Sequence, residues 1–260
     1  MEIIEQIKNN KLIGNPTEIQ KICLNKLKSN PLPNPKSELW RLSNKSKFSN
    51  FLDYSVNEID PKFDLPYTYN PQNIIRLIIG ENNQNSLVEK DYSIQQLSED
   101  ILDKYIKQKI SCFDKNEHWS DLLNLSLSSE KNILGLKING TKIPPIEIFS
   151  NASSNSLNAK TLIIFLEKNC DINLLQVNLG KENSSLSQST FFCLEENSCL
   201  NHGVVSYGEN RSNLLNSLNV IQQKNSEYNL GSLHFKFNYA RFEIRIKQSA
   251  GNAKTNIKGM

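Results

Sequence analysis

The sequence lacks the features by which several protein classes are recognised. It has no run close to the roughly 18 apolar residues of a membrane span, and its mean hydropathy is −0.48. Its first residues, Met1–Gln6, show neither the basic segment nor the apolar core of a secretory signal. Its five cysteines include no CxxC pair, which favours reduced thiols over a disulfide framework. We therefore expect a cytoplasmic protein that does not bind membranes.

Strong charge and catalytic motifs are missing as well. The 30 basic residues exceed the 27 acidic ones only slightly, and the net charge of +3 is too small to indicate nucleic-acid binding. The chain contains no GxSxG or HExxH motif and no phosphate-binding glycine loop. The sequence thus predicts neither a nucleic-acid binder nor an enzyme, and it offers no catalytic residue.

The patterns that are present divide the chain in two. Over residues 1–130, apolar residues at helical spacing predict helices after Pro16 and over 37–48, 97–106 and 116–125, with a buried strand at 74–79. Over residues 131–260 the helical signals stop and strands follow one another. We therefore expect a helical or mixed region followed by a β domain.

The β domain repeats itself every 28 residues. Three columns hold across three copies: a turn asparagine (Asn169, Asn197, Asn225), an apolar position (Ile172, Leu200, Tyr228) and a second asparagine (Asn173, Asn201, Asn229). A fourth copy, residues 241–260, follows after a step of 25, with Ala250-Gly251 at the turn.

Strands that repeat without intervening helices favour a parallel β-solenoid, and a β-sandwich with similar hairpins is the alternative. The turn asparagines suit left-handed backbone. In a solenoid, Asn173, Asn201 and Asn229 are expected to stack as a hydrogen-bonded ladder. The last repeat reaches Met260 with no capping element, so we expect the β core to be incomplete at that end.

Cys193, Cys199 and His202 are the candidate metal ligands, because thiolates and imidazoles hold iron–sulfur clusters and zinc. The repeat places Cys193 in an apolar column that is expected to be interior, and Cys199 in an acidic column that is expected to face water. His202 lies in a leucine column and points away from Cys199. We therefore interpret His202 as a buried, hydrogen-bonded side chain and predict no metal site.

The remaining candidates also have simpler interpretations. His118 lies beside Trp119 on a predicted helix and is expected to pack, and His234 alternates with apolar residues and has no evident partner. Arg241, Arg245 and Lys247 alternate with apolar residues, which is typical of the solvated face of a strand; a ligand-binding stripe is the alternative.

One stretch resembles a known family. Leu32-Pro33, followed by Glu38-Leu39-Trp40-Arg41-Leu42-Ser43, is similar to the SufD motif, in which a Leu-Pro pair precedes Glu-x-Trp-(Lys/Arg)-Tyr-Thr. Leu42 and Ser43 replace the usual tyrosine and threonine. The segments 142–146 and 240–260 resemble the crossing into the β core of the SufB/SufD family and one of its rungs.

The resemblance implies a right-handed parallel β-helix with helical regions on either side. It also implies a SufD-type scaffold of SUF iron–sulfur cluster assembly, which pairs with a SufB-like protein and works with a SufC-like ATPase. The complex as a whole handles the cluster, so this chain alone is expected to bind no cofactor. The ATPase-docking region is expected to follow the last rung present here. A general solenoid interaction module and a β-helical carbohydrate-active enzyme stay open as alternatives.

Overall fold

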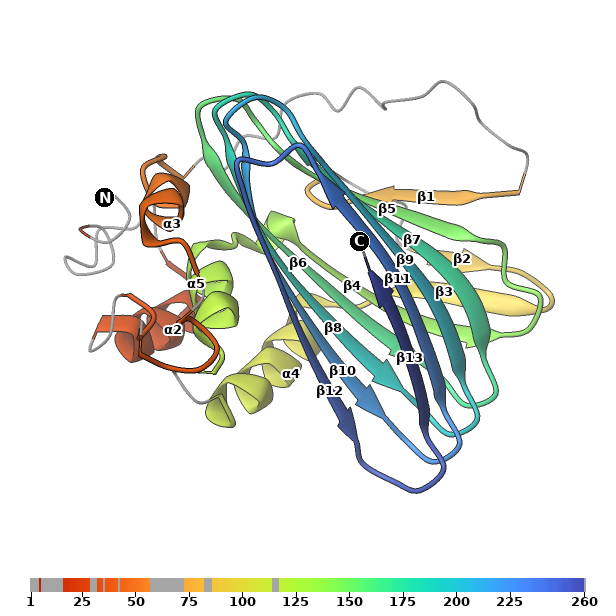
Figure 1. Cartoon of the computed structure of the whole chain (residues 1–260). Helices are drawn as coiled ribbons and strands as arrows, with labels where there is room; N and C mark the ends of the chain where they lie inside the picture. Colours follow the sequence, from red (N-terminus) through yellow and green to blue (C-terminus); the bar gives the residue numbers. More distant parts are fainter. Residues whose placement is uncertain are drawn as a thin grey trace.

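The computed structural model describes residues 5, 16–28, 32–34, 36–41, 43–56, 73–81, 86–113 and 117–259. The chain is mainly β: a few helices precede a parallel β-solenoid (Figure 1). The predicted fold class is confirmed. A β-sandwich is ruled out for these strands, because each solenoid strand pairs in parallel with the strand two places further along the chain.

Helices gather in the first half of the chain. They are α2 (Glu18–Lys28), α3 (Lys45–Phe51), α4 (Glu99–Ser111), α5 (Trp119–Leu127) and a single 3-10 turn (Glu130–Asn132). The helix predicted over 37–48 begins later in the chain than predicted. Residues 36–41 form turns, and the helix begins only after Asn44, whose side chain accepts a hydrogen bond from the Lys47 backbone N–H at 3.1 Å.

The strands form two sheets. Sheet A has the order β12-β10-β8-β6-β4-β3-β2, and sheet B has the order β1-β5-β7-β9-β11-β13. Sheet A contains β2 (Ser86–Val88), β3 (Tyr92–Gln96), β4 (Ile133–Gly140), β6 (Leu157–Leu166), β8 (Ser185–Leu194), β10 (Asn213–Gln222) and β12 (Tyr239–Gln248). Sheet B contains β1 (Ile75–Ile78), β5 (Ile146–Ala152), β7 (Asp171–Gly180), β9 (Cys199–Gly208), β11 (Glu227–Phe235) and β13 (Lys254–Gly259).

The solenoid begins with β4, close to the predicted boundary at residue 131. The segment before it nevertheless supplies strands to both sheets, because β1 pairs in parallel with β5, and β3 pairs antiparallel with β4. The division into a helical or mixed region over 1–130 and an incomplete β core over 131–260 stays a prediction.

The 28-residue step holds over most of the solenoid. Asn169, Asn197 and Asn225 lie at its turns with φ of 61°, 58° and 58°, as predicted. The last step is shorter than 28 residues, but longer than the 25 residues predicted. Asn213 pairs with Tyr239, a step of 26, because β11 and the turn after it are each one residue shorter than in the preceding copy. The turn before β13 is one residue longer and brings the step to 27.

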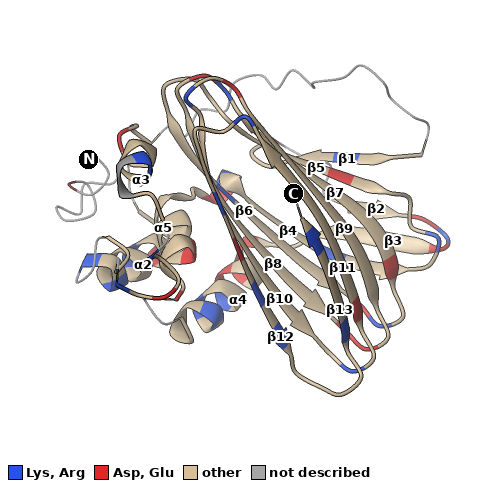
Figure 2. Ribbon diagram, in the orientation of Figure 1, with Lys and Arg blue, Asp and Glu red and all other residues tan. Residues whose placement is uncertain are grey.

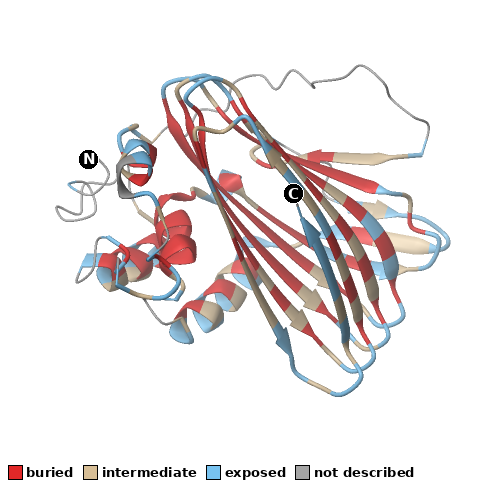
Figure 3. Cartoon of the chain, in the orientation of Figure 1, coloured by how far each residue is buried: buried red, intermediate tan, exposed pale blue. Residues whose placement is uncertain are grey.

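Two apolar cores follow from this arrangement. One fills the solenoid, where Ile172, Leu200 and Tyr228 are buried and in register on β7, β9 and β11, so this predicted column is confirmed. The other lies between the helices and the outer face of sheet A (Figure 3). The described helices pack on sheet A, and none of them lies over sheet B (Figure 1).

Charged residues are frequent at the turns and on the helices (Figure 2), and the middle strands β8, β9 and β10 carry none, whereas β12 carries Arg241, Glu243, Arg245 and Lys247. Several pair across one step of the repeat, such as Lys168 with Glu196 at 2.8 Å and Lys181 with Glu209 at 3.1 Å. None of the described helices combines the length and the apolar character needed to cross a membrane.

Leu200→Asp is expected to lower the free energy of unfolding by about 3 kcal/mol or more, because it places an unpaired carboxylate in the apolar interior. Urea unfolding of the two variants measures the difference. Gly231→Asp is the matched control: it adds the same side chain to the outer face of the neighbouring strand, where a Cβ meets nothing within 4 Å. Equal stability of the two variants would contradict the assignment of Leu200 to the interior.

Candidate functional site

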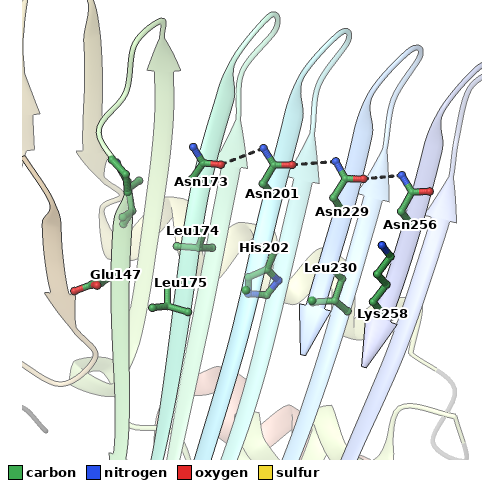
Figure 4. A pocket seen from close by; sticks show the side chains of 14 residues that line it. Glu147, Asn173, Leu174, Leu175, Asn201, His202, Asn229, Leu230, Asn256 and Lys258 are labelled. Carbon is green, nitrogen blue, oxygen red and sulfur yellow. Dashed lines mark hydrogen bonds between the residues drawn. The ribbon is translucent and has the colours of Figure 1, made fainter. Parts of the chain in front are cut away.

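The outer face of sheet B, which none of the described helices covers, carries a groove that runs across its strands, with a volume of about 760 Å³ (Figure 4). Leu175, Gly203 and Gly231 line its floor, and the two glycines leave it shallow because they add no side chain. Glu147 and Lys258 lie at its opposite ends (Figure 4). The groove thus follows the solenoid axis and has opposite charges at its two ends.

A ladder of asparagine amides forms one wall of the groove. The Nδ2 of Asn201 donates to Asn173 Oδ1 at 3.1 Å, and the Nδ2 of Asn229 donates to Asn201 Oδ1 at 3.0 Å (Figure 4). The predicted ladder is therefore confirmed, and Asn256 extends it by donating to Asn229. The sequence missed Asn256 because the assumed step of 25 put this residue out of register.

The ladder leaves part of each amide free for a partner. An amide has two N–H donors and two acceptor lone pairs, and a ladder bond uses one of each. The second N–H of Asn229 donates to Glu227 Oε1 at 3.1 Å, whereas the remaining acceptor lone pairs repeat at the strand spacing of about 4.8 Å. At the Glu147 end of the groove, Arg76 Nε lies 2.6 Å from Glu147 Oε2 and forms an ion pair with it. This arrangement suits the binding of an extended partner by hydrogen bonds.

His202 lies beneath this face, inside the solenoid. Its side chain is 3% exposed, and its Nδ1 lies 2.9 Å from the Tyr228 hydroxyl. The ring meets Phe192 edge to face at 4.9 Å between centroids. Burial lowers the pKa of His202 to about 3. The prediction of a buried, hydrogen-bonded histidine is confirmed.

The prediction for Cys193 is wrong. Its column, with Phe165 and Ile221, lies on the outer face of sheet A and not in the interior. Helix α4 covers this face, so an apolar column is as suitable there as inside. The Tyr105 hydroxyl lies 3.2 Å from Cys193 Sγ, and burial raises the pKa of both groups.

Cys199 faces outward on sheet B, as predicted, between Asp171 and Glu227 in the neighbouring strands. Partial burial and the two carboxylates raise the pKa of its thiol to about 11. Cys193 and Cys199 therefore lie on different sheets, and His202 points into the interior. Within the part of the chain that the structure describes, no three His, Cys, Asp or Glu side chains converge on a point.

Arg241 and Arg245 alternate with apolar residues on β12, but the predicted solvated face is wrong for both. The Arg241 Nε contacts Glu243 at 2.5 Å, and its guanidinium lies 3.9 Å from the centroid of the Trp40 ring. Arg245 Nη2 lies 2.7 Å from the other oxygen of Glu243. The helical layer covers this face, and only Lys247 is exposed there as predicted.

Asp121, in α5, is a buried carboxylate that the sequence analysis missed. It accepts hydrogen bonds from Ser189 Oγ at 2.9 Å and from Asn219 Nδ2 at 3.1 Å, and it pairs with Arg245 Nη1 at 3.3 Å. Burial raises the pKa of this carboxyl, and the guanidinium of Arg245 acts against that rise. The sequence signal that could have revealed this buried carboxylate is an aspartate directly before Leu122-Leu123 on a predicted helix.

The other two histidines pack against aromatic rings. His118 stacks on Phe113 with ring centroids 4.5 Å apart. The prediction that His118 packs is therefore confirmed. His234 lies 4.8 Å from the Phe242 ring, and burial lowers its pKa. Neither ring nitrogen of His234 has a hydrogen-bond partner among the described residues.

Acid is expected to destabilise the fold through His202. Its pKa is depressed in the folded state, so the unfolded state takes up the proton first. The contribution of neutral His202 is complete above about pH 6.5 and is lost at about 1.4 kcal/mol per pH unit as the pH falls towards 3. Unfolding free energies measured from pH 7 to 4.5 test this.

The matched variant is the double substitution His202→Leu with Tyr228→Phe, which removes both hydrogen-bonding partners together. Leucine already occupies this column on the two neighbouring strands, as Leu174 and Leu230. The pH dependence of the variant is expected to be shallower. The same slope in both proteins would show that His202 does not titrate as stated.

Cys193, Cys199 and His202 are expected to bind no metal, because they point to three separate environments. Elemental analysis of iron and zinc after anaerobic purification measures this, with a Cys193→Ser, Cys199→Ser double variant beside the native chain. A stoichiometric metal that disappears in the variant would contradict the placement of these thiols.

Comparison with known proteins assigns the chain to no family. No family model matches it, and no curated protein matches it. The resemblance carried by residues 32–43 accordingly stays a prediction, and any functional conclusion depends on that motif together with the geometry described above.

Proposed function

We propose that this chain is a non-catalytic scaffold subunit of SUF-type iron–sulfur cluster assembly. In this proposal it pairs with a SufB-like protein and works with a SufC-like ATPase, and the cluster is cargo of the whole complex. Two features support it: the solenoid preceded by helices, which the SufB/SufD resemblance implies, and the contact between the segments that carry the resemblance.

That contact is the observation on which the proposal mainly rests. Arg241 lies in one of the family-like segments, about 200 residues beyond the Leu32–Ser43 motif. Its Nη1 donates to Ser43 Oγ at 2.9 Å, its Nη2 donates to the Leu39 carbonyl at 2.8 Å, and its guanidinium stacks on Trp40. Both segments thus belong to one junction between the helical layer and the solenoid. Pro35 and Leu42 of the motif lie outside the described residues.

The thiols suit a scaffold in a reducing, cytoplasmic compartment. All five cysteines are free. Burial raises the pKa of Cys23 to about 12 and that of Cys170 to about 11, which keeps both as protonated, weakly reactive thiols at neutral pH. We therefore place cluster chemistry in the complex rather than on these side chains.

A general protein-interaction module is the second candidate. It is favoured by the bare face of sheet B, where an uncharged ladder and a shallow groove are free to receive a partner. A β-helical carbohydrate-active enzyme is a weaker candidate, because the groove brings one carboxylate, Glu147, which is already paired with Arg76.

Affinity capture with tagged chain tests the proposal. Co-expressed SufB-like protein is expected to be retained, and SufC-like ATPase is expected to be retained only when the SufB-like protein is present, since the resemblance places ATPase docking after the last rung. Failure to retain the SufB-like protein would contradict the scaffold proposal. Micromolar binding of the SufC-like protein alone would put the docking surface within residues 1–260.

A Gly231→Arg variant separates the two candidates. Gly231 is exposed and has room for a side chain, so arginine fills the groove without disturbing the fold. Loss of an unrelated partner together with unchanged SufB-like binding would assign the groove a separate role. The matched control is Val88→Arg, at a position that is 71% exposed and outside the groove.

A further inference from the structure

A second hollow lies on the other side of the molecule, between α4 and the outer face of sheet A. It opens where α4 ends at Ser111 while β8, β10 and β12 continue beneath it. Its volume is about 350 Å³, within the range of roughly 300 to 1,000 Å³ found for small-molecule sites. The proposed scaffold function makes no use of this cleft.

Aromatic rings form one wall of the cleft. Phe113 stacks on His118 with an interplanar angle of 7°, and on Phe191 with centroids 6.2 Å apart and an angle of 15°. These three rings line the cleft and lie nearly parallel to one another. Such a wall presents flat faces and edges against which a planar ring packs at favourable offsets.

Cationic side chains also line the cleft. Lys109, Arg245 and Lys247 line the cleft, and no Asp or Glu among the described residues does so. Arg245 is committed to Asp121 and Glu243, and Lys109 lies over the Tyr105 ring at 5.2 Å. Lys247 is exposed and has no hydrogen-bond or ion-pair partner among the described residues, so its ammonium group is the one available to a ligand.

We propose that this cleft binds a small organic anion that carries a planar ring. The ring packs against Phe113 and Phe191, and the anionic group meets Lys247 at the open end, with Lys109 adding to the positive potential. A neutral ring would leave Lys247 without a partner, and an inorganic anion would leave the aromatic wall without one. The cleft therefore selects for both properties in one molecule.

Three probes separate these contributions: naphthalene-2-sulfonate as the aromatic anion, 2-naphthalenemethanol as its neutral counterpart and inorganic phosphate as the anion alone. Titration of ¹⁵N-labelled protein by NMR reports both affinity and place. The sulfonate is expected to bind most tightly and to shift the amides of Phe191, Asn219 and Lys247. Equal binding of all three probes, no sulfonate binding, or shifts confined to other surfaces would overturn the proposal.

Lys247→Gln is expected to weaken sulfonate binding about threefold to fivefold, the value of one partly exposed ion pair, and to leave binding of the neutral probe unchanged. Lys254→Gln is the matched control, because it removes an exposed lysine from the far sheet, outside the groove. Phe191→Leu is expected to weaken both naphthalene probes. If Lys247→Gln and Lys254→Gln lose affinity equally, general attraction to a basic protein is the cause and the site is refuted.

Discussion

Each side chain of this solenoid lies about 5 Å from its counterpart one turn further on, and the rest of the structure must satisfy that constraint. Inside, it allows apolar residues to stack on apolar residues, as Ile172, Leu200 and Tyr228 do. Outside, it turns a repeated asparagine into a ladder, since each amide both donates and accepts. At the turns it brings opposite charges together, as with Lys168 and Glu196 one step later.

The helical layer is joined to the repeat by a different interaction. Asp121 is fully buried. Its carboxylate accepts hydrogen bonds from Ser189 on β8 and Asn219 on β10, and it pairs with Arg245 on β12. One carboxylate thus ties three successive strands to α5. Removing one member of such a buried pair leaves an uncompensated charge, which typically costs about 3 to 5 kcal/mol. The same pairing occupies Arg245, so that among the described residues of the neighbouring cleft Lys247 is the cation without a partner.

Local repetition made the solenoid predictable, and packing between distant segments made other features unpredictable. A 28-residue period fixes which residues share a column, so the register of Leu200 and the turn at Asn197 followed directly from it. The period does not say which outer face a helix will cover. For that reason Cys193 and Arg241 were misplaced: outward apolar and charged residues have the same spacing whether they meet water or a helix. The last step was misjudged because β11 and the turn after it each lose one residue, and the turn before β13 adds one back.

The two faces of the solenoid therefore have different capacities. Sheet A is covered in part by its own helices and keeps a hollow of about 680 Å³ beside β4 and β6 and the cleft of about 350 Å³ over β8, β10 and β12, whose size suits a metabolite-sized ligand. On sheet B, neighbouring asparagines already hold the ladder amides in one orientation, so a partner that binds there fixes few additional rotamers. Because immobilising side chains is among the main costs of association, a preorganised ladder of uncharged amides can gain affinity from modest contacts. A rigid surface of this kind is what a scaffold requires, since its task is to hold partners in a fixed relation.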